Sequence, residues 1–138
     1  MIVDSSALIA IVLDERQAEQ LRDAMLTAAT VVIPAPVLTE VWLVTRRHAD
    51  ERHERAEVLI RALVLMGAEV APFEHSHADI TAIARDLYGK GNGKGGLLNF
   101  GDLMVYAIAK QTGLPLLCTG SDFASTDLVL HPASRLTP

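Results

Sequence analysis

Short apolar runs alternate along the chain with longer segments in which apolar residues recur every three or four positions. Continuous apolar runs of this length are typical of buried strands, and the longer spacing is typical of amphipathic helices. Four runs are therefore predicted to be strands, with 128–130 as a candidate fifth. The four lie at residues 1–3, 31–33, 68–73 and 114–119.

Helices are predicted between these strands. They cover residues 7–12, 18–28, 37–48, a segment around 56–63, 80–88 and 103–111. Ser76 and Asp79 resemble a capping box ahead of the helix at 80–88, and Gly113 is positioned to end the last helix. Strands that alternate with helices predict a single α/β domain over residues 1–138. We expect three layers, α/β/α, with a central parallel sheet of four or five strands.

The composition is that of a globular protein. Of the 138 residues, 50% are hydrophobic and 21% are charged, which argues against a disordered chain. The apolar runs are too short to span a bilayer, and no basic region typical of a secretory signal precedes the first strand. The single cysteine, Cys118, excludes an intramolecular disulfide and fits a reducing compartment. We therefore expect a cytoplasmic protein.

The formal net charge of the chain is −5. Strong non-specific binding to nucleic acid normally needs a basic surface, so the charge argues against that kind of binding. Clusters of carboxylates that hold metal ions also make a chain acidic. The charge therefore does not exclude an enzyme that acts on nucleic acid.

Three acidic residues are predicted to meet at one edge of the sheet. Asp4 directly follows the first strand, Asp122 follows the fourth, and Asp102 precedes the helix at 103–111. The carboxyl ends of parallel strands share one rim with the helix starts, and α/β proteins bind ligands there. Taken singly, Asp4 and Asp102 are ordinary helix N-caps and Asp122 is an ordinary loop residue. Their common position is what suggests a site.

Glu40 is a fourth acid that can reach this rim. Its helical neighbours Val37, Leu43 and Val44 are apolar, and an unpaired carboxylate is rarely buried among such residues because its desolvation is costly. Either this face looks into a cleft that holds a cation, or Glu40 extends along the protein surface. The pattern leaves both readings open.

Carboxylates that converge on one rim raise each other's pKa unless a positive charge lies between them. Ligands that are all oxygen select hard cations, here Mg²⁺ or Mn²⁺. Acid clusters that hold such ions hydrolyse phosphodiesters, because the ion lowers the pKa of a bound water. His75 and His77 are too isolated to indicate a zinc site.

The glycine-rich segment 91–96 formally matches the dinucleotide fingerprint G-x-G-x-x-G. That fingerprint follows a strand and opens a helix, whereas this segment follows a predicted helix. We interpret it as a surface loop from which Lys94 contacts a phosphate backbone. Arg46 and Arg47, which follow the helical stretch around Glu40, are further candidate substrate contacts.

Four short motifs carry these acids. They are Asp4-Ser5-Ser6-Ala7, Thr39-Glu40-Val41, Asn99-Phe100-Gly101-Asp102 and Gly120-Ser121-Asp122-Phe123. Each alone is a weak signal, but their order and spacing over the whole chain resemble the PIN-domain ribonucleases, most closely the VapC toxins of bacterial toxin–antitoxin pairs. The resemblance implies a PIN-like fold and a metal-dependent endoribonuclease, usually a homodimer. It also implies a VapB-type antitoxin that holds the enzyme inactive and binds operator DNA.

The resemblance further implies roles for individual residues. Asp4, Glu40 and Asp102 match the three central acids, which bind Mg²⁺ or Mn²⁺ and carry catalysis. Ser6 matches a hydroxyl residue that contacts the metal-bound water or the phosphate. Asn99 is expected to hydrogen-bond to the third acid or to the substrate.

The fourth acid of the family has an ambiguous counterpart. Many relatives carry an acid or asparagine at the position where this chain has Gly120, and others carry two consecutive acids before the phenylalanine. Here only Asp122 remains, with Ser121 beside it, so Asp122 is assigned to the metal site. Asp127 is a weaker candidate for the same role.

Two other classes of function share part of the pattern. Phosphoryl transfer through an aspartyl phosphate needs a second acid two residues after Asp4, where this chain has Ser6, and a receiver domain needs paired acids after the first strand. Both fit poorly. The alternative outside enzymes is a catalytically inactive PIN-like module that only binds a partner, and it predicts no metal-dependent change in thermal stability.

Overall fold

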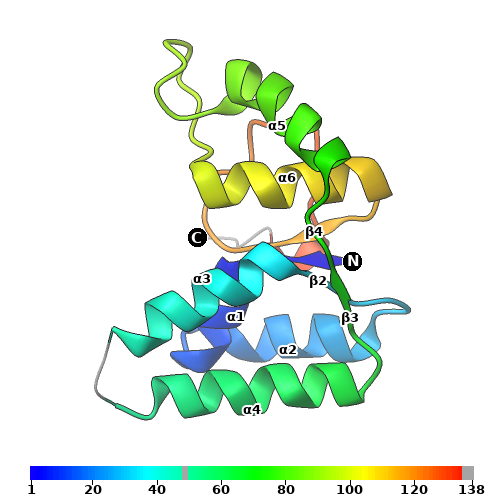
Figure 1. Cartoon of the computed structure of the whole chain (residues 1–138). Helices are drawn as coiled ribbons and strands as arrows, with labels where there is room; N and C mark the ends of the chain where they lie inside the picture. Colours follow the sequence, from blue (N-terminus) through cyan, green and yellow to red (C-terminus); the bar gives the residue numbers. More distant parts are fainter. Residues whose placement is uncertain (48–49, 135–138) are drawn as a thin grey trace.

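A sheet of four short parallel strands lies at the centre of the computed structural model, which describes residues 1–47 and 50–134 (Figure 1). The strands are β1 (Ile2–Val3), β2 (Val32–Pro34), β3 (Glu69–Ala71) and β4 (Leu116–Leu117). Their order across the sheet is β3-β2-β1-β4, and every pairing is parallel. Ile2 of β1 pairs with Val32 on one side and with Leu116 on the other.

Six helices cover the two faces of this sheet. They are α1 (Ser5–Val12), α2 (Ala18–Thr27), α3 (Ala35–Arg46), α4 (Arg52–Leu65), α5 (His75–Tyr88) and α6 (Phe100–Thr112), followed by the short 3-10 helix η1 (Pro132–Ser134). In Figure 1, α5 and α6 lie on one side of the sheet and α1 to α4 on the other. The predicted three-layer α/β/α architecture with a parallel sheet is therefore confirmed. No helix in the described ranges is long and apolar enough to cross a membrane.

The core is built on β1, whose two residues are completely buried. Because both faces of a parallel sheet are covered by helices, its strands are apolar throughout rather than alternating. The largest fully buried side chains come from strands and helices of both layers. They include Ile2, Leu8, Leu21, Ile33, Leu98, Ile108, Leu116 and Leu117.

Two helices begin with other capping residues than the sequence predicted. The capping box of α5 joins Glu74 and His77 instead of Ser76 and Asp79, and the Glu74 amide donates to His77 Nδ1 at 2.9 Å. A histidine that accepts through a ring nitrogen is not part of the usual capping signature, which is why the pattern pointed further along the chain. Helix α6 begins at Phe100, three residues earlier than predicted, because its N-cap is Asn99.

Other boundaries follow the expected chemistry. Gly113 ends α6 in the left-handed conformation, with φ 68°, as predicted. Residues 128–130 form no strand: Leu130 makes only an isolated bridge to Leu116, so the sheet has four strands. The prediction for α3 extended to His48, which lies outside the described residues.

The apolar face predicted for the helix at 80–88 is only partly buried. Ile80, Ala84 and Tyr88 pack on the core. The exposed fractions of Ile83 and Leu87 are 66% and 53%, because in residues 1–47 and 50–134 no element covers the flank of α5 on which these two side chains lie.

The strand order creates a switch point at β1. From β1 the chain adds β2 and β3 on one side, then returns to add β4 on the other side. At such a point the connections leave a crevice beyond the carboxyl ends of the two central strands, and open α/β sheets bind ligands there. Asp4 is the residue that directly follows β1, so the fold presents it to this crevice.

The Asp127 carboxylate ties the segment after β4 to α6. It accepts hydrogen bonds from the Tyr106 hydroxyl at 2.7 Å and from Lys110 Nζ. Tyr106 is only 4% exposed. We predict that Asp127→Ala lowers the free energy of unfolding by about 1–2 kcal/mol, because the Tyr106 hydroxyl loses its acceptor.

Denaturant unfolding checks this prediction. The matched control is Asp86→Ala, which removes an exposed carboxylate that pairs only with its neighbour Arg85 among the described residues. Equal stability of the two variants would contradict a structural role for Asp127.

Candidate metal centre

One cavity of about 300 Å³ gathers six of the residues singled out in the sequence. It opens at the carboxyl ends of β1 and β4 and is lined by side chains from four separate segments. The six residues are Asp4, Ser6, Glu40, Asn99, Asp102 and Asp122.

The two carboxylate oxygens of Asp4 have different environments. Oδ2 caps helix α1 by accepting from the Ser6 amide at 3.0 Å, and it also accepts from the Ser6 hydroxyl. Oδ1 is buried and has no hydrogen-bond partner in the described part of the chain. An unpaired buried carboxylate oxygen is costly, so this atom is suited to ligate a cation.

The pKa of Asp4 reflects this environment. It is raised from 3.8 to about 6, mainly by burial and to a smaller extent by the nearby charges of Asp102 and Glu40. The two hydrogen bonds from Ser6 act in the opposite direction. A bound cation would remove both effects, because it neutralises the repulsion and replaces the lost hydration.

Ser6 connects the ends of the two central strands. Its hydroxyl donates to Asp4 Oδ2 and accepts from the Thr119 amide at 3.0 Å. This places the segment that follows β4 next to the end of β1. The Thr119 contact could not be read from the sequence, since it joins positions 113 residues apart through a backbone amide.

Asp102 is held by a reciprocal capping box at the start of α6. The Asp102 amide donates to Asn99 Oδ1 and the Asn99 amide donates to Asp102 Oδ2, both at 2.9 Å. Asp102 is thus the third residue of the helix and not its N-cap, as the sequence had suggested. Burial raises the pKa of Asp102, and the charges of Asp122 and Glu40 add to this effect.

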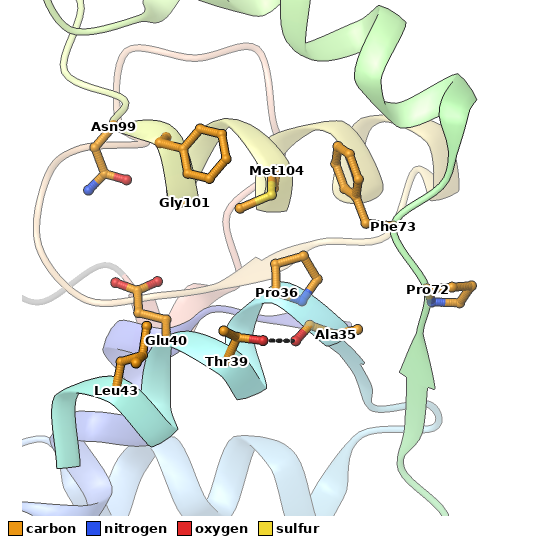
Figure 2. Close-up of a pocket in the computed structure, with 11 residues that line it drawn as sticks. Ala35, Pro36, Thr39, Glu40, Leu43, Pro72, Phe73, Asn99, Gly101 and Met104 are labelled. Atoms are coloured by element: carbon orange, nitrogen blue, oxygen red, sulfur yellow. Dashed lines mark hydrogen bonds between the residues drawn. The ribbon is translucent and has the colours of Figure 1, made fainter. Parts of the chain in front are cut away.

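Glu40 reaches the cavity from α3. Its carboxylate points toward Asn99 and Gly101 (Figure 2), which answers the question that the sequence left open. A Cβ atom at Gly101 would lie only 3.1 Å from Glu40 Oε2. The glycine therefore leaves the space that the carboxylate occupies, and the sequence reasoning assigned it no role of its own.

Asp122 completes the acidic lining from the loop after β4. It is exposed, while the next residue, Phe123, is 3% exposed and anchors the loop in the core. Gly120, two positions earlier, has φ 78°, a conformation that favours glycine. Asp127 is not part of the lining, since its carboxylate is engaged by α6.

Three proposed substrate contacts lie away from this cavity. Arg46, at the end of α3, donates through Nε to His53 Nε2 at 3.1 Å. Arg47 follows as the C-cap residue, and Lys94 is exposed in the loop after α5. None of the three lines the acidic cavity.

The chemical type of the donor atoms in this cavity suits a hard cation. All the available side-chain donors are oxygens, one of them is buried without a partner among the described residues, and the neighbouring acids raise the pKa of Asp4 and of Asp102. In residues 1–47 and 50–134, no three acidic, histidine or cysteine side chains stand close enough to hold an ion as they are. Binding therefore requires the carboxylates to move closer together, and the exposed Asp122 has the most freedom to do so.

The chain matches the family model described as PIN domain over residues 1–128. It is 37% identical over 128 residues to ribonuclease VapC42 of Mycobacterium tuberculosis, a match that covers 93% of this chain and 96% of the relative. It is 41% identical over 130 residues to ribonuclease VapC36 of the same species, with 93% and 91% covered.

Solved structures show the same fold at lower identity. A toxin–antitoxin complex from Klebsiella pneumoniae contains a chain that superposes with a TM-score of 0.71 at 20% identity, covering 95% of this chain and 96% of that one. The Mycobacterium tuberculosis toxin VapC20, described as cleaving the sarcin–ricin loop, gives a TM-score of 0.70 at 17% identity, with 93% and 95% covered. At such identities these likenesses establish the fold alone.

The raised pKa of Asp4 predicts an unusual pH dependence of stability. The folded chain holds the proton more tightly than the unfolded chain, so this stabilisation is fully present below pH 3.8 and is lost as the pH rises through about 6. We expect the chelator-treated protein to lose on the order of 1 kcal/mol of unfolding free energy from this group between about pH 5 and about pH 8.

The comparison of variants isolates this contribution. Asp4→Asn should flatten the pH dependence, whereas Asp23→Asn, an exposed acid on α2, should leave it as in the parent protein. An Asp4→Asn profile that parallels the parent in chemical denaturation would show that Asp4 does not hold the extra proton.

A substitution at Gly101 should change the stability of the protein and its affinity for metal in different ways. Gly101→Ala should maintain or raise the unfolding free energy, because alanine is favoured over glycine in a helix by roughly 0.5–1 kcal/mol. The same substitution should displace Glu40 and weaken Mn²⁺ binding by roughly tenfold, as other changes around metal ligands do. Isothermal titration calorimetry measures the affinity, and an unchanged dissociation constant would contradict the role given to Gly101.

Proposed function

The chain belongs to the PIN-domain family and within it to the VapC ribonucleases, and from this premise we propose that it is a metal-dependent endoribonuclease that acts as the toxin of a toxin–antitoxin pair. The observation that carries the chemical part of the proposal is Asp4 Oδ1, a buried carboxylate oxygen without a partner among the described residues. Asp4 lines one cavity together with three other acids.

In this proposal the ligands of Mg²⁺ or Mn²⁺ are Asp4, Glu40, Asp102 and Asp122. The all-oxygen donor set supports a hard cation over zinc. Such an ion lowers the pKa of a bound water and offsets charge on the attacked phosphate. Asp4 and Asp102 provide fixed positions because each is held by helix-capping hydrogen bonds, while Glu40 and Asp122 approach from α3 and the loop after β4.

Neighbouring polar residues orient these ligands. Ser6 fixes the rotamer of Asp4 through its hydroxyl, and Asn99 fixes Asp102 through the capping box. Arg46, Arg47 and Lys94 are proposed to meet RNA phosphates at a distance from the cut. Their separation from the acids means that they contribute to affinity for the RNA rather than to the chemistry.

The partners proposed are RNA as substrate, a VapB-type antitoxin and a second copy of the chain. Solved structures of the same fold include a toxin–antitoxin complex and a VapBC2 pair of Rickettsia felis bound to a DNA fragment from its promoter. For this chain we propose that DNA is met only through the antitoxin. The antitoxin would block the acidic cavity and leave the fold intact.

The rival function is an inactive PIN-like module that only binds a partner. The acid set argues against it, since an unpaired buried oxygen on Asp4 has a cost in a protein that binds no ion. The two functions differ in their response to a chelator.

Cleavage assays test the proposal. The purified chain should cut RNA in the presence of Mn²⁺ or Mg²⁺ and stop in excess chelator. Asp4→Asn and Asp102→Asn should abolish cleavage, and Ser6→Ala should slow it by roughly 10–100-fold, the usual cost of losing a hydrogen bond to a metal ligand. Asp127→Asn is the control, because its carboxylate lies outside the cavity.

Two results would contradict the metal mechanism. One is cleavage that persists in excess chelator, and the other is cleavage that survives both aspartate substitutions. A parent protein that neither cleaves RNA nor gains thermal stability from Mn²⁺ would instead favour the inactive module.

A further inference from the structure

A groove of about 610 Å³ lies beside the acidic cavity, between the first turns of α3 and α6 (Figure 2). Its walls are almost entirely apolar. They include Ala35, Pro36, Leu43, Phe73, Phe100 and Met104. A groove of this size is within the range of small-ligand sites.

Phe100 is the most exposed large apolar side chain that lines the groove. Its side chain is 81% exposed although it is the first residue of α6, and Leu43 across the groove is 60% exposed. Exposed apolar side chains that gather around one groove, unlike single ones scattered over a surface, are typical of a site that meets another molecule. Phe100 stands between Asn99, which caps α6, and Gly101, which accommodates Glu40.

The groove adjoins the acidic cavity through two shared lining residues. Glu40 and Asn99 line both of them, so a molecule with a phosphate at the acids extends into the groove with its neighbouring groups. Among the residues that the structure describes, the groove is lined by one carboxylate, from Glu40, and by no lysine or arginine. Its chemistry therefore repels a second phosphate and accepts an uncharged, flat, apolar group.

We propose that this groove holds a nucleobase of the RNA next to the phosphate that is cut, and that Phe100 provides the ring on which this base stacks. The inference rests on the proposed ribonuclease function and adds a residue that determines affinity and position of the cut. Proteins that read single-stranded RNA stack unpaired bases on exposed aromatic side chains, and base and ring are both flat and apolar.

The other occupant that an apolar groove suggests is a second copy of the chain. A protein surface that covered Phe100 would also cover Glu40 and Asn99, which line the same groove, and it would restrict access to the acids. A base that enters with the substrate leaves the site open between turnovers. The two shared lining residues therefore favour the base.

Kinetic measurements on three variants test the proposal. The bond that the parent protein cuts is first mapped in a pool of single-stranded RNA oligonucleotides, and one cut sequence is then synthesised. Phe100→Ala should raise KM for it by about 30-fold, the middle of the range for a lost base–aromatic stack. Phe100→Trp should restore the parent KM. The control is Leu87→Ala, another exposed apolar residue that lines neither cavity.

Abasic substrates identify the base. Removing the base next to the cut should raise KM for the parent protein but leave the KM of Phe100→Ala unchanged, because the stack is already lost. Mn²⁺ affinity and the mass measured by light scattering should be the same for Phe100→Ala and the parent protein.

Three outcomes would overturn the inference. If the parent protein cuts RNA and Phe100→Ala has the parent KM, the groove does not bind a base. If Phe100→Ala halves the mass in solution, the groove is an interface between copies. If the parent protein cuts no RNA with Mn²⁺ present, the ribonuclease function fails and the base site fails with it.

Discussion

The burial of one carboxylate at the end of the central strand is the constraint on which the rest of the site depends. Asp4 lies where β1 ends and α1 begins, inside the core and at the switch point of the sheet. A charged group can occupy such a position only if its oxygens are compensated. Helix α1 and Ser6 compensate one oxygen, and the other has no partner among the described residues. Three more acids line the same cavity as Asp4.

The fold partly compensates the negative charge of the acids. Helices α1 and α6 both begin at the cavity, and the amino end of a helix carries a partial positive charge. Asp4 and Asp102 are held there by backbone amides. This explains how a cluster of acids can exist in a folded chain before any cation is bound, while the raised pKa values of both residues show that the compensation is incomplete.

The sequence predicted which segments are helices and strands better than where each begins and ends. It also predicted which acids gather at the cavity better than the residues that surround them. Apolar runs located all four strands because a buried parallel strand needs continuous apolar residues. Three of the acids were found because they follow strands or open a helix, and Glu40 was found because its helical neighbours are apolar. The start of α5 was missed because His77 accepts the capping bond through a ring nitrogen. The groove beside Phe100 could not be predicted, since the exposure of a side chain depends on which elements pack together.

The unpaired oxygen of Asp4 also has a consequence for the lifetime of the protein. A ligand that binds only the folded state lowers the population of open conformations in proportion to its occupancy. If the acids hold the cation proposed here, the chain without it opens more often and presents more backbone to proteases. The supply of divalent cations would then influence both the activity of each molecule and the number of molecules that persist.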